Sequence, residues 1–301
     1  MRSGSGTCYG YEVHSAHDFR FLRGGTGEPL EVVSSGEGET GRGDQLLREW
    51  TPTPARPLHA RLYSEGKRYR LWLAGSGTFL VDPELPRIAV PTEDEDPLRR
   101  EVRLWSVPAL LCFLARGDLP LHAAAVEVDG EAVLLAAPHM VGKTTLAAAF
   151  FGAGHRLLSE DLTCLRLSPG PAVVPGPALL RVRPDVAHRL ELPFARVVRE
   201  DEDRVHFSVE EERRGDCLPV PVRAVVFLRP SDNGITLERA DTAQAVRDLW
   251  ALSFRLPIKE QVAASFAGMA DLAGSVPVWN LAHARRLEDV SATIDRIVSG
   301  V

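Results

Sequence analysis

Long apolar runs, blocks of positive charge and closely spaced cysteines are all missing from this sequence of 301 residues. No apolar run reaches the roughly 20 residues that cross a bilayer, and the first residues lack the apolar segment of a secretion signal. The net charge of −6 comes without a basic block, which argues against a nucleic-acid or membrane partner. The four cysteines form no Cys-x-x-Cys pair, so we expect reduced thiols in a cytoplasmic protein.

Lysine is scarce as well, and only three residues carry it: Lys67, Lys143 and Lys259. Lys143 lies in the segment 137–145, Ala-Pro-His-Met-Val-Gly-Lys-Thr-Thr, which follows the apolar run 133–136 and precedes the apolar run 146–151. This order predicts a strand, a turn and a helix, with the Gly-Lys-Thr tripeptide at the start of the helix. The pattern is that of a Walker A phosphate loop with Ala137 in place of its first glycine.

Such a loop binds phosphate because successive backbone N–H groups form a concave anion site at the start of a helix. Lys143 would neutralise the β and γ phosphates of ATP, and the Thr144 hydroxyl would complete a Mg²⁺ shell. The loop residues expected to bind the nucleotide are Ala137, His139, Met140, Val141, Gly142, Lys143, Thr144 and Thr145. Residues 138–140 replace the usual glycine and serine, and Pro138 removes one N–H group, so weakened nucleotide affinity is an alternative.

The Asp-Gly pair at 129–130 separates two apolar runs, which predicts a two-residue type I′ hairpin turn. Pairing Val128 with Glu131 and stepping outward places His122 opposite Ala137, at the mouth of the phosphate loop. The strand that leads into the loop is then antiparallel to its predecessor. The sequence therefore predicts a mixed sheet, unlike that of a plain doubly wound nucleotide fold.

Glu160 and Asp161 follow a strand expected over 156–159, one helix beyond the phosphate loop. One carboxylate there can hold Mg²⁺, and the second, close to a like charge, can accept a hydroxyl proton. His122 could hydrogen-bond to that base and orient it. The structural alternatives are a solvated acidic turn and a histidine packed within its strand. No His-Glu-x-x-His spacing and no nucleophile motif accompanies these residues.

The chain divides by pattern into a smaller β-rich domain over 1–97 and a phosphate-loop domain over 98–301, joined by the acidic stretch 91–97. The first part should contain short strands over 9–13, 19–22, 30–33, 68–73 and 78–81. Residues 98–115 indicate a helix that Pro108 kinks or splits. Later strands are expected over 223–228, 235–239 and 276–281, and later helices over 242–253, 259–273 and 285–299.

Three segments, 121–126, 137–145 and 155–161, resemble the bacterial HPr kinase/phosphorylase superfamily, and the similarity extends loosely over residues 105–301. Residues 173–183 resemble HPr-kinase-like proteins, including kinases of peptide gene clusters, more than the true enzymes. The resemblance implies a mixed-sheet fold related to phosphoenolpyruvate carboxykinase, with the histidine, the lysine and the acidic pair around the γ phosphate. It also implies Glu160 as the base and Asp161 as the Mg²⁺ partner, although the sequence itself does not determine which of the two carboxylates is the base.

The sequence also departs from true HPr kinases. It has no counterpart of their C-terminal Arg-Gly-Leu-Gly segment, its first carboxylate is Glu160 where aspartate is usual, and residues 1–100 do not resemble their N-terminal domain. A true HPr kinase and the reverse phosphorolysis are therefore not expected.

Together these patterns predict an α/β protein, with a phosphate-loop kinase domain on a mixed sheet and a β-rich N-terminal domain. We expect an ATP- and Mg²⁺-dependent kinase whose acceptor is a hydroxyl of a peptide serine or threonine, or of a small natural-product intermediate. His122, Lys143, Glu160 and Asp161 are the expected catalytic residues, and Thr144 and Asp161 the expected metal ligands. The N-terminal region would recognise the acceptor. The alternatives are a nucleotide-binding pseudokinase that acts as a scaffold and a plain ATPase; a homo-oligomer is left open.

Overall fold

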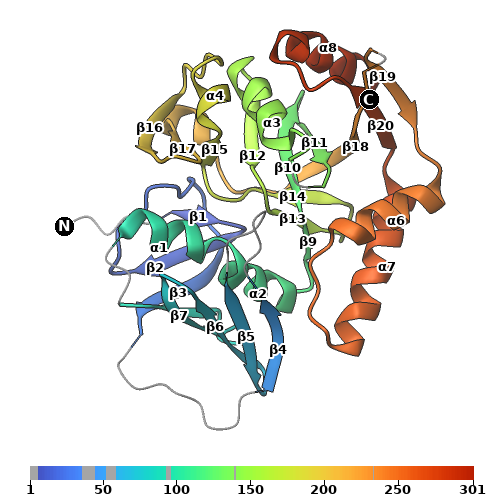
Figure 1. Cartoon of the computed structure of the whole chain (residues 1–301). Coiled ribbons are helices and arrows are strands. Elements are labelled where there is room, and N and C mark those ends of the chain that lie inside the picture. Colours follow the sequence, from blue (N-terminus) through green and yellow to red (C-terminus); the bar gives the residue numbers. More distant parts are fainter. Residues whose placement is uncertain (1–5, 36–44, 52–58, 93–95, 139, 233) are drawn as a thin grey trace.

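The computed structural model describes residues 6–35, 45–51, 59–92, 96–138, 140–232 and 234–301. This part of the chain is a mixed α/β protein built on an eight-stranded, a nine-stranded and a three-stranded sheet (Figure 1). The two large sheets each contain parallel and antiparallel neighbours, so the predicted mixed α/β class is confirmed. No helix within the described ranges is long and apolar enough to cross a membrane.

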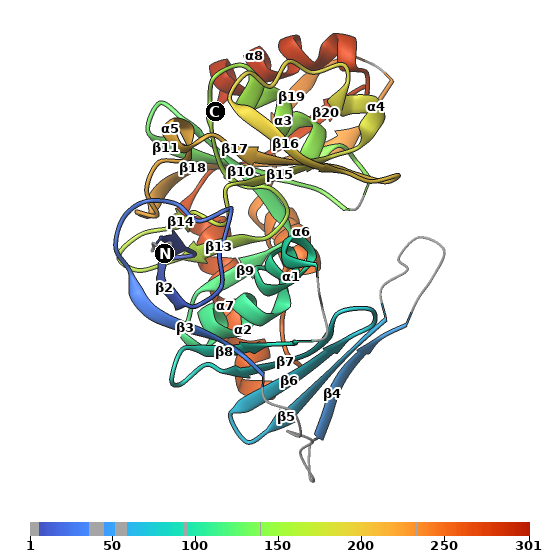
Figure 2. The ribbon, with the colours of Figure 1, turned by 90° about the vertical axis from the view of Figure 1, so that its left-hand side faces the viewer.

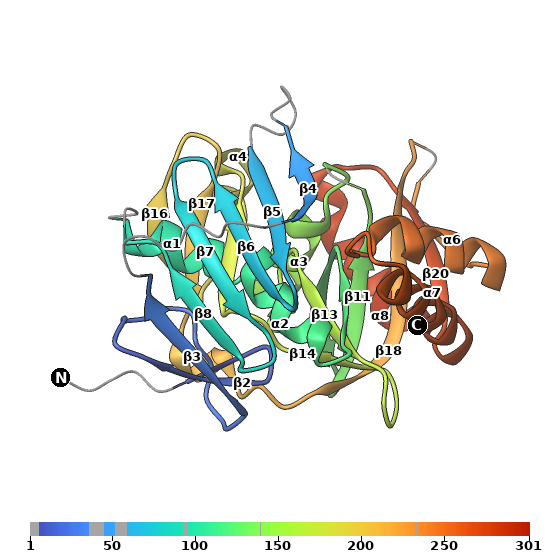
Figure 3. The same ribbon diagram turned by 90° about the horizontal axis from the view of Figure 1, so that it is seen from below.

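The N-terminal residues form the eight-stranded sheet, in the order β1-β2-β3-β8-β7-β6-β5-β4. Its strands are β1 (Thr7–Cys8), β2 (Tyr11–Ser15), β3 (Glu28–Ser34), β4 (Gln45–Trp50), β5 (Ala60–Glu65), β6 (Arg68–Leu73), β7 (Gly77–Asp82) and β8 (Arg87–Val90). Figure 3 shows the strands from β3 to β4 side by side. Alternate residues along β6 are buried, because one face of this sheet packs on apolar side chains.

Two helices, α1 (Pro97–Leu104) and α2 (Val107–Ala115), lie between this sheet and the rest of the molecule (Figure 2). They correspond to the single helix expected over 98–115, and they confirm the predicted split. Pro108 occupies the second position of α2, where the absence of an N–H group costs nothing. The core beneath the sheet also includes Cys164, Val174 and Leu256 from much later in the chain. The division at residues 97 and 98 therefore stays a prediction.

The strand expected over 19–22 is wrong. The backbone N–H groups of Arg20 and Phe21 donate to the buried carboxylate of Glu101 in α1, at 2.9 Å each. A side chain 80 residues away thus satisfies the donors that a neighbouring strand would otherwise use. The strand expected over 9–13 begins only at Tyr11, because Tyr9 and Gly10 both have positive φ angles and form the turn between β1 and β2.

The nine-stranded sheet contains the path β12-β10-β11-β18-β14-β13-β9, with β20 beside β18 and β19 beside β20. Its strands are β9 (Leu119–Leu121), β10 (Ala123–Val128), β11 (Glu131–Ala136), β12 (Arg156–Ser159), β13 (Thr163–Arg166), β14 (Ala172–Val174), β18 (Val220–Pro230), β19 (Thr236–Arg239) and β20 (Val278–His283). Val128 pairs with Glu131 and Ala123 with Ala136, so the predicted hairpin register is confirmed. The next step outward brings His122 to the level of Ala137.

Helices cover both faces of this sheet, which is why β10 is apolar along almost its whole length. Ala124 and Val126 face a core shared with α3 (Lys143–Gly152) and α8 (Val290–Gly300), whereas Ala123 and Ala125 face α6 (Thr242–Leu252) and α7 (Lys259–Ser275). These helices lie close to the ranges expected from the sequence. The remaining helices are short: α4 (Pro184–Ala187), α5 (Glu211–Arg214) and the 3₁₀ turn η1 (Leu287–Asp289).

The small sheet β15-β17-β16 is formed by β15 (Leu179–Val182), β16 (Ala195–Glu200) and β17 (Val205–Val209). Asp96 connects it to α1, because this carboxylate caps the helix and also forms an ion pair with Arg199 of β16. The pKa of Asp96 is lowered to about 2, mainly by its hydrogen bonds with Arg199.

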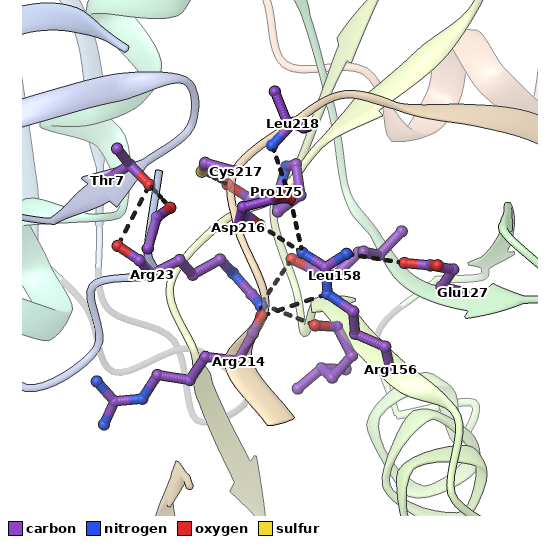
Figure 4. A network of polar contacts seen from close by, with 12 residues as sticks. Thr7, Arg23, Glu127, Arg156, Leu158, Pro175, Arg214, Asp216, Cys217 and Leu218 are labelled. Atoms are coloured by element: carbon purple, nitrogen blue, oxygen red, sulfur yellow. Dashed lines mark hydrogen bonds and ion pairs between the residues drawn. The ribbon is translucent and has the colours of Figure 1, made fainter. Parts of the chain in front are cut away.

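One buried arginine ties the N-terminal segment to the central sheet (Figure 4). Arg23 is 2% exposed, and its guanidinium donates to the carbonyl oxygens of Gly176 at 2.6 Å, Leu157 at 2.7 Å and Leu158 at 3.3 Å, and also to that of Arg214. Burial lowers the pKa of Arg23 to about 10, which still leaves it charged at neutral pH. We call this set of contacts the Arg23 clamp. It holds β12, the strand that leads directly into the acidic pair.

Candidate active site

The predicted phosphate loop connects β11 to the start of α3. Gly142 precedes the helix with a φ of 112°, and Met140 also has a positive φ, of 63°. Ala137 is fully buried in the core and has no positive φ, so alanine fits at the position of the first glycine. The loop positions with the positive φ angles that favour glycine are therefore Met140 and Gly142.

The other loop residues differ in what surrounds them. The Met140 side chain is 79% exposed, and its carbonyl oxygen accepts a hydrogen bond from Arg285 at 2.9 Å. Val141 packs against the core beneath α3, and Thr145 is half-buried in the first turn of the helix. His139 lies outside the described residues.

The Lys143 side chain turns back into the loop. Its ammonium donates to the carbonyl oxygen of Ala137 at 2.7 Å and to that of Pro138 at 3.1 Å, and it lies 3.0 Å from Nε2 of His122. Burial lowers the pKa of Lys143, and the carboxylates of Asp161 and Glu160 oppose that shift. Lys143, the only cation of the loop among the described residues, is thus held by hydrogen bonds at the start of α3, beside His122.

His122 connects the lysine to the acidic pair. Its Nδ1 lies 3.2 Å from Oδ1 of Asp161, which confirms the prediction that this ring reaches the acidic pair. A charged lysine can only donate, so Nε2 of His122 is the acceptor, and the ring proton resides on Nδ1, facing the carboxylate. The backbone N–H of His122 donates to the carbonyl oxygen of Leu252 at 2.9 Å, which fixes the histidine just before the start of β10.

Glu160 makes a separate set of contacts. Oε1 of Glu160 accepts a hydrogen bond from the Thr144 hydroxyl at 3.4 Å, and Oε2 forms an ion pair with Nε of Arg181 at 2.7 Å. Burial raises the pKa of Glu160, and the positive charge of Arg181 opposes this. The Glu160 side chain is only 10% exposed, so it is not a solvated turn residue, whereas Asp161 is 45% exposed.

Arg181 is the main site residue that the sequence did not reveal. It lies on β15, between the buried residues Leu180 and Val182. A single basic residue inside a strand of otherwise apolar side chains was the available signal, since such a cation is usually paired. Its acidic partner could not be deduced without the packing of β15 beside the acidic pair.

A cavity of about 700 Å³ opens onto these side chains. Its lining combines His122, Glu160 and Asp161 with residues from distant parts of the chain, among them Tyr9, Trp105 and Phe254. The Tyr9 hydroxyl donates to the carbonyl oxygen of Leu162 at 3.1 Å, directly after the acidic pair. The N-terminal segment therefore forms part of the wall around the candidate site.

No family model matches this sequence, and no match was found among curated proteins. Among solved structures, the Hpr(Ser) kinase/phosphatase from Coxiella burnetii is similar with a TM-score of 0.32 and 11% sequence identity. That similarity covers 60% of this chain and 94% of the other. It is a distant similarity, so function is inferred from the residues of the site itself.

Proposed function

We propose that this protein is a kinase that uses ATP and Mg²⁺ to phosphorylate a hydroxyl group. The observation that carries the proposal is the convergence of two contact chains at the start of α3. One runs from Lys143 through His122 to Asp161, and the other runs from Thr144 to Glu160. A cation, a hydroxyl and carboxylates beside a helix N-terminus are groups that phosphoryl-transfer sites use, and the histidine joins the cation to one carboxylate.

Lys143 would bind the β and γ phosphates. Its ammonium now contacts two loop carbonyl oxygens, and it would exchange these for phosphate oxygens when ATP occupies the loop. Phosphate would also restore the pKa that burial lowers, because a negative group beside the ammonium favours its charged form.

The Thr144 hydroxyl and Glu160 are the residues that would hold Mg²⁺. No group of three metal-binding side chains occurs within the described ranges, but Mg²⁺ is usually held by one or two protein oxygens together with water and substrate phosphates. The adjacent oxygens of Thr144 and Glu160 fit that requirement. When bound, the ion would neutralise charge that develops on the transferred phosphoryl group.

Asp161 is then the candidate base. Both carboxylates line the cavity, but Asp161 contacts His122 and is more exposed than Glu160. As the acceptor oxygen forms its bond to the γ phosphorus, the bond from that phosphorus to the β-phosphate oxygen breaks, and ADP leaves. The hydroxyl proton passes to the Asp161 carboxylate, which the Nδ1–H group of His122 orients. This assignment reverses the roles that the family resemblance implied for the two carboxylates.

Calorimetric titration of ATP, with and without Mg²⁺, tests the nucleotide site first. We expect Mg²⁺-dependent binding in the wild type, and loss of most affinity in Lys143→Ala. At a ligand concentration about a hundredfold above Kd, binding adds about 2.7 kcal/mol of stability. This corresponds to a rise in Tm of about 5 °C for a chain of this size. The absence of binding at millimolar ATP would refute the kinase proposal.

The two carboxylates are separated by a matched pair of variants. Asp161→Asn should keep Mg²⁺-dependent ATP binding and lose transfer to hydroxyl acceptors, whereas Glu160→Gln should lose the Mg²⁺ dependence of binding. The reverse pattern would restore Glu160 as the base. ATP binding without any phosphorylated product would favour the scaffold function, and ADP release independent of acceptor would favour a plain ATPase.

A further inference from the structure

The lining of the cavity beside the acidic pair includes a charged side chain, Arg48, that the proposed chemistry leaves unused. Arg48 belongs to β4, and its guanidinium lies 5.0 Å from the ring centre of Trp50 and 5.9 Å from that of Phe254. Arg48 forms no ion pair with any described residue. The adjacent Glu49 is turned to other partners, because its carboxylate binds His59 and Arg61.

A second arginine lies close to the first. Arg255 stacks over the ring of Trp250 at 3.8 Å and donates to the backbone carbonyl oxygens of Trp250 and Ser253, and no acidic side chain within the described ranges pairs with it. Its pKa is lowered, first by burial and then by the positive charge of Arg48. Two like charges that approach each other without an acid gain stability when an anion joins them.

The N-terminal end of α2 adds to this positive potential. Ser106 and Val107, at the start of that helix, also line the cavity. The dipole of a helix start favours an anion, although on its own it defines no site, and Pro108 leaves the first turn of α2 one N–H group short. Here the dipole accompanies a guanidinium that lines the same cavity without an acidic partner among the described residues.

Apolar side chains make up much of the remaining lining: Val102, Trp105, Leu110, Leu162, Leu179 and Phe254. The segment 252–254 contacts both polar parts of the lining, because the Leu252 carbonyl oxygen binds the backbone N–H of His122 and the Phe254 ring lies beside Arg48. A volume of about 700 Å³ accommodates a small molecule or the end of a peptide.

We propose that the phosphate acceptor is an amphipathic molecule with a hydroxyl group, an apolar body and a carboxylate, and that Arg48 binds the carboxylate. This inference rests on the proposed kinase function for the role of the hydroxyl. The hydroxyl lies toward Asp161, the body contacts the apolar wall, and the carboxylate occupies the part of the cavity that Arg48 and Arg255 make positive. Arg48 is a specificity residue in this arrangement and takes no part in proton transfer.

Three probes that share a ten-carbon chain and a terminal hydroxyl test the charge preference: 10-hydroxydecanoate, its methyl ester and 10-amino-1-decanol. Calorimetry on the full chain without nucleotide should show about tenfold tighter binding of the carboxylate than of the ester or the amine, which is about 1.4 kcal/mol. Arg48→Gln should remove that preference. Arg196→Gln, which changes an exposed arginine on β16 away from the cavity lining, should preserve it.

Equal affinity for the three probes, or a preference that survives Arg48→Gln, would overturn the inference. Transfer is measured separately, by incubation of each probe with ATP and Mg²⁺ and detection of the phosphate ester. An Arg48-dependent carboxylate preference without any phosphorylated product would support the assignment of the cavity and refute the kinase proposal. ATP binding and transfer to the ester or the amine, but not to the carboxylate, would support the kinase and refute the acceptor class.

Discussion

Replacement of Arg23 by methionine should destabilise the whole protein, although no charged partner is lost. The Arg23 clamp joins the N-terminal segment to three separate parts of the chain through backbone carbonyl oxygens alone. Methionine is flexible enough to fill most of the space without strain. It cannot donate a hydrogen bond, however, so the carbonyl oxygens around it lose a charged donor.

The magnitude follows from the hydrogen bonds. Contacts at 2.6, 2.7 and 3.3 Å, together with the bond to Arg214, each contribute about 1 kcal/mol or somewhat more for a charged donor. Removal of a cation that is 2% exposed also relieves part of its desolvation, as its lowered pKa indicates. We therefore expect a loss of about 3 kcal/mol in the free energy of unfolding, and a decrease in Tm of about 6 °C.

Calorimetric or fluorescence melting of Arg23→Met beside the wild type measures this loss. Arg20→Met, three residues earlier on an exposed side chain, is the control and should change stability by less than about 0.5 kcal/mol. Melting of Arg23→Met within about 1 °C of the wild type would mean that the carbonyl contacts contribute no net stability, and would refute this prediction.

Two further predictions concern charge. Burial lowers the pKa of Lys143, and only the charged form of its side chain neutralises phosphate. ATP affinity, measured by calorimetric titration, should therefore fall as the pH rises from about 7 to about 10, and Lys143→Arg should flatten that profile. A wild-type affinity that does not change with pH would contradict this prediction. The pKa of Asp96 is lowered to about 2, so the stability that its charge provides is present above its unfolded-state pKa of about 3.9 and is lost as the pH falls through the folded value. Asp96→Asn, which can still cap α1, should cost about 1 kcal/mol or less at neutral pH, because the ion pair with Arg199 is partly exposed, and the difference in denaturant melts should vanish at low pH. A difference unchanged at pH about 2 would assign the effect to capping.

Local rules made part of the fold predictable. The Asp-Gly turn at 129–130 requires positive φ at both residues, and the structure has 52° and 82° there. That turn fixes the register of the hairpin. Counting residue pairs outward from the turn then predicts that His122 lies beside the loop, because the register determines which residues of the two strands face each other. Pro108 likewise marked the break between two helices, since a proline cannot continue a helix from the preceding turn.

The rest depends on contacts between distant segments. Arg181 reaches Glu160, 21 residues earlier in the chain, only because β15 packs beside the acidic pair. Arg23 is surrounded by carbonyl oxygens from residues 157–214, and nothing near it in the sequence indicates burial. The contacts of Arg48 similarly require β4 to lie beside the segment after α6. Such partners are set by tertiary packing, which outweighs local preference.

The hairpin also limits how the site can move. His122 and the loop lie at the open ends of one pair of strands, and the acidic pair ends β12, which is hydrogen-bonded to the first of them. Backbone hydrogen bonds between the strands therefore fix the spacing between His122, the loop and the acidic pair. Any closing movement around a substrate must come from the parts of the lining outside the nine-stranded sheet, among them the edge strand β4 and residues Ser253 and Phe254. Substitutions there should alter the rates of substrate entry and release while leaving the spacing between His122 and Asp161 unchanged.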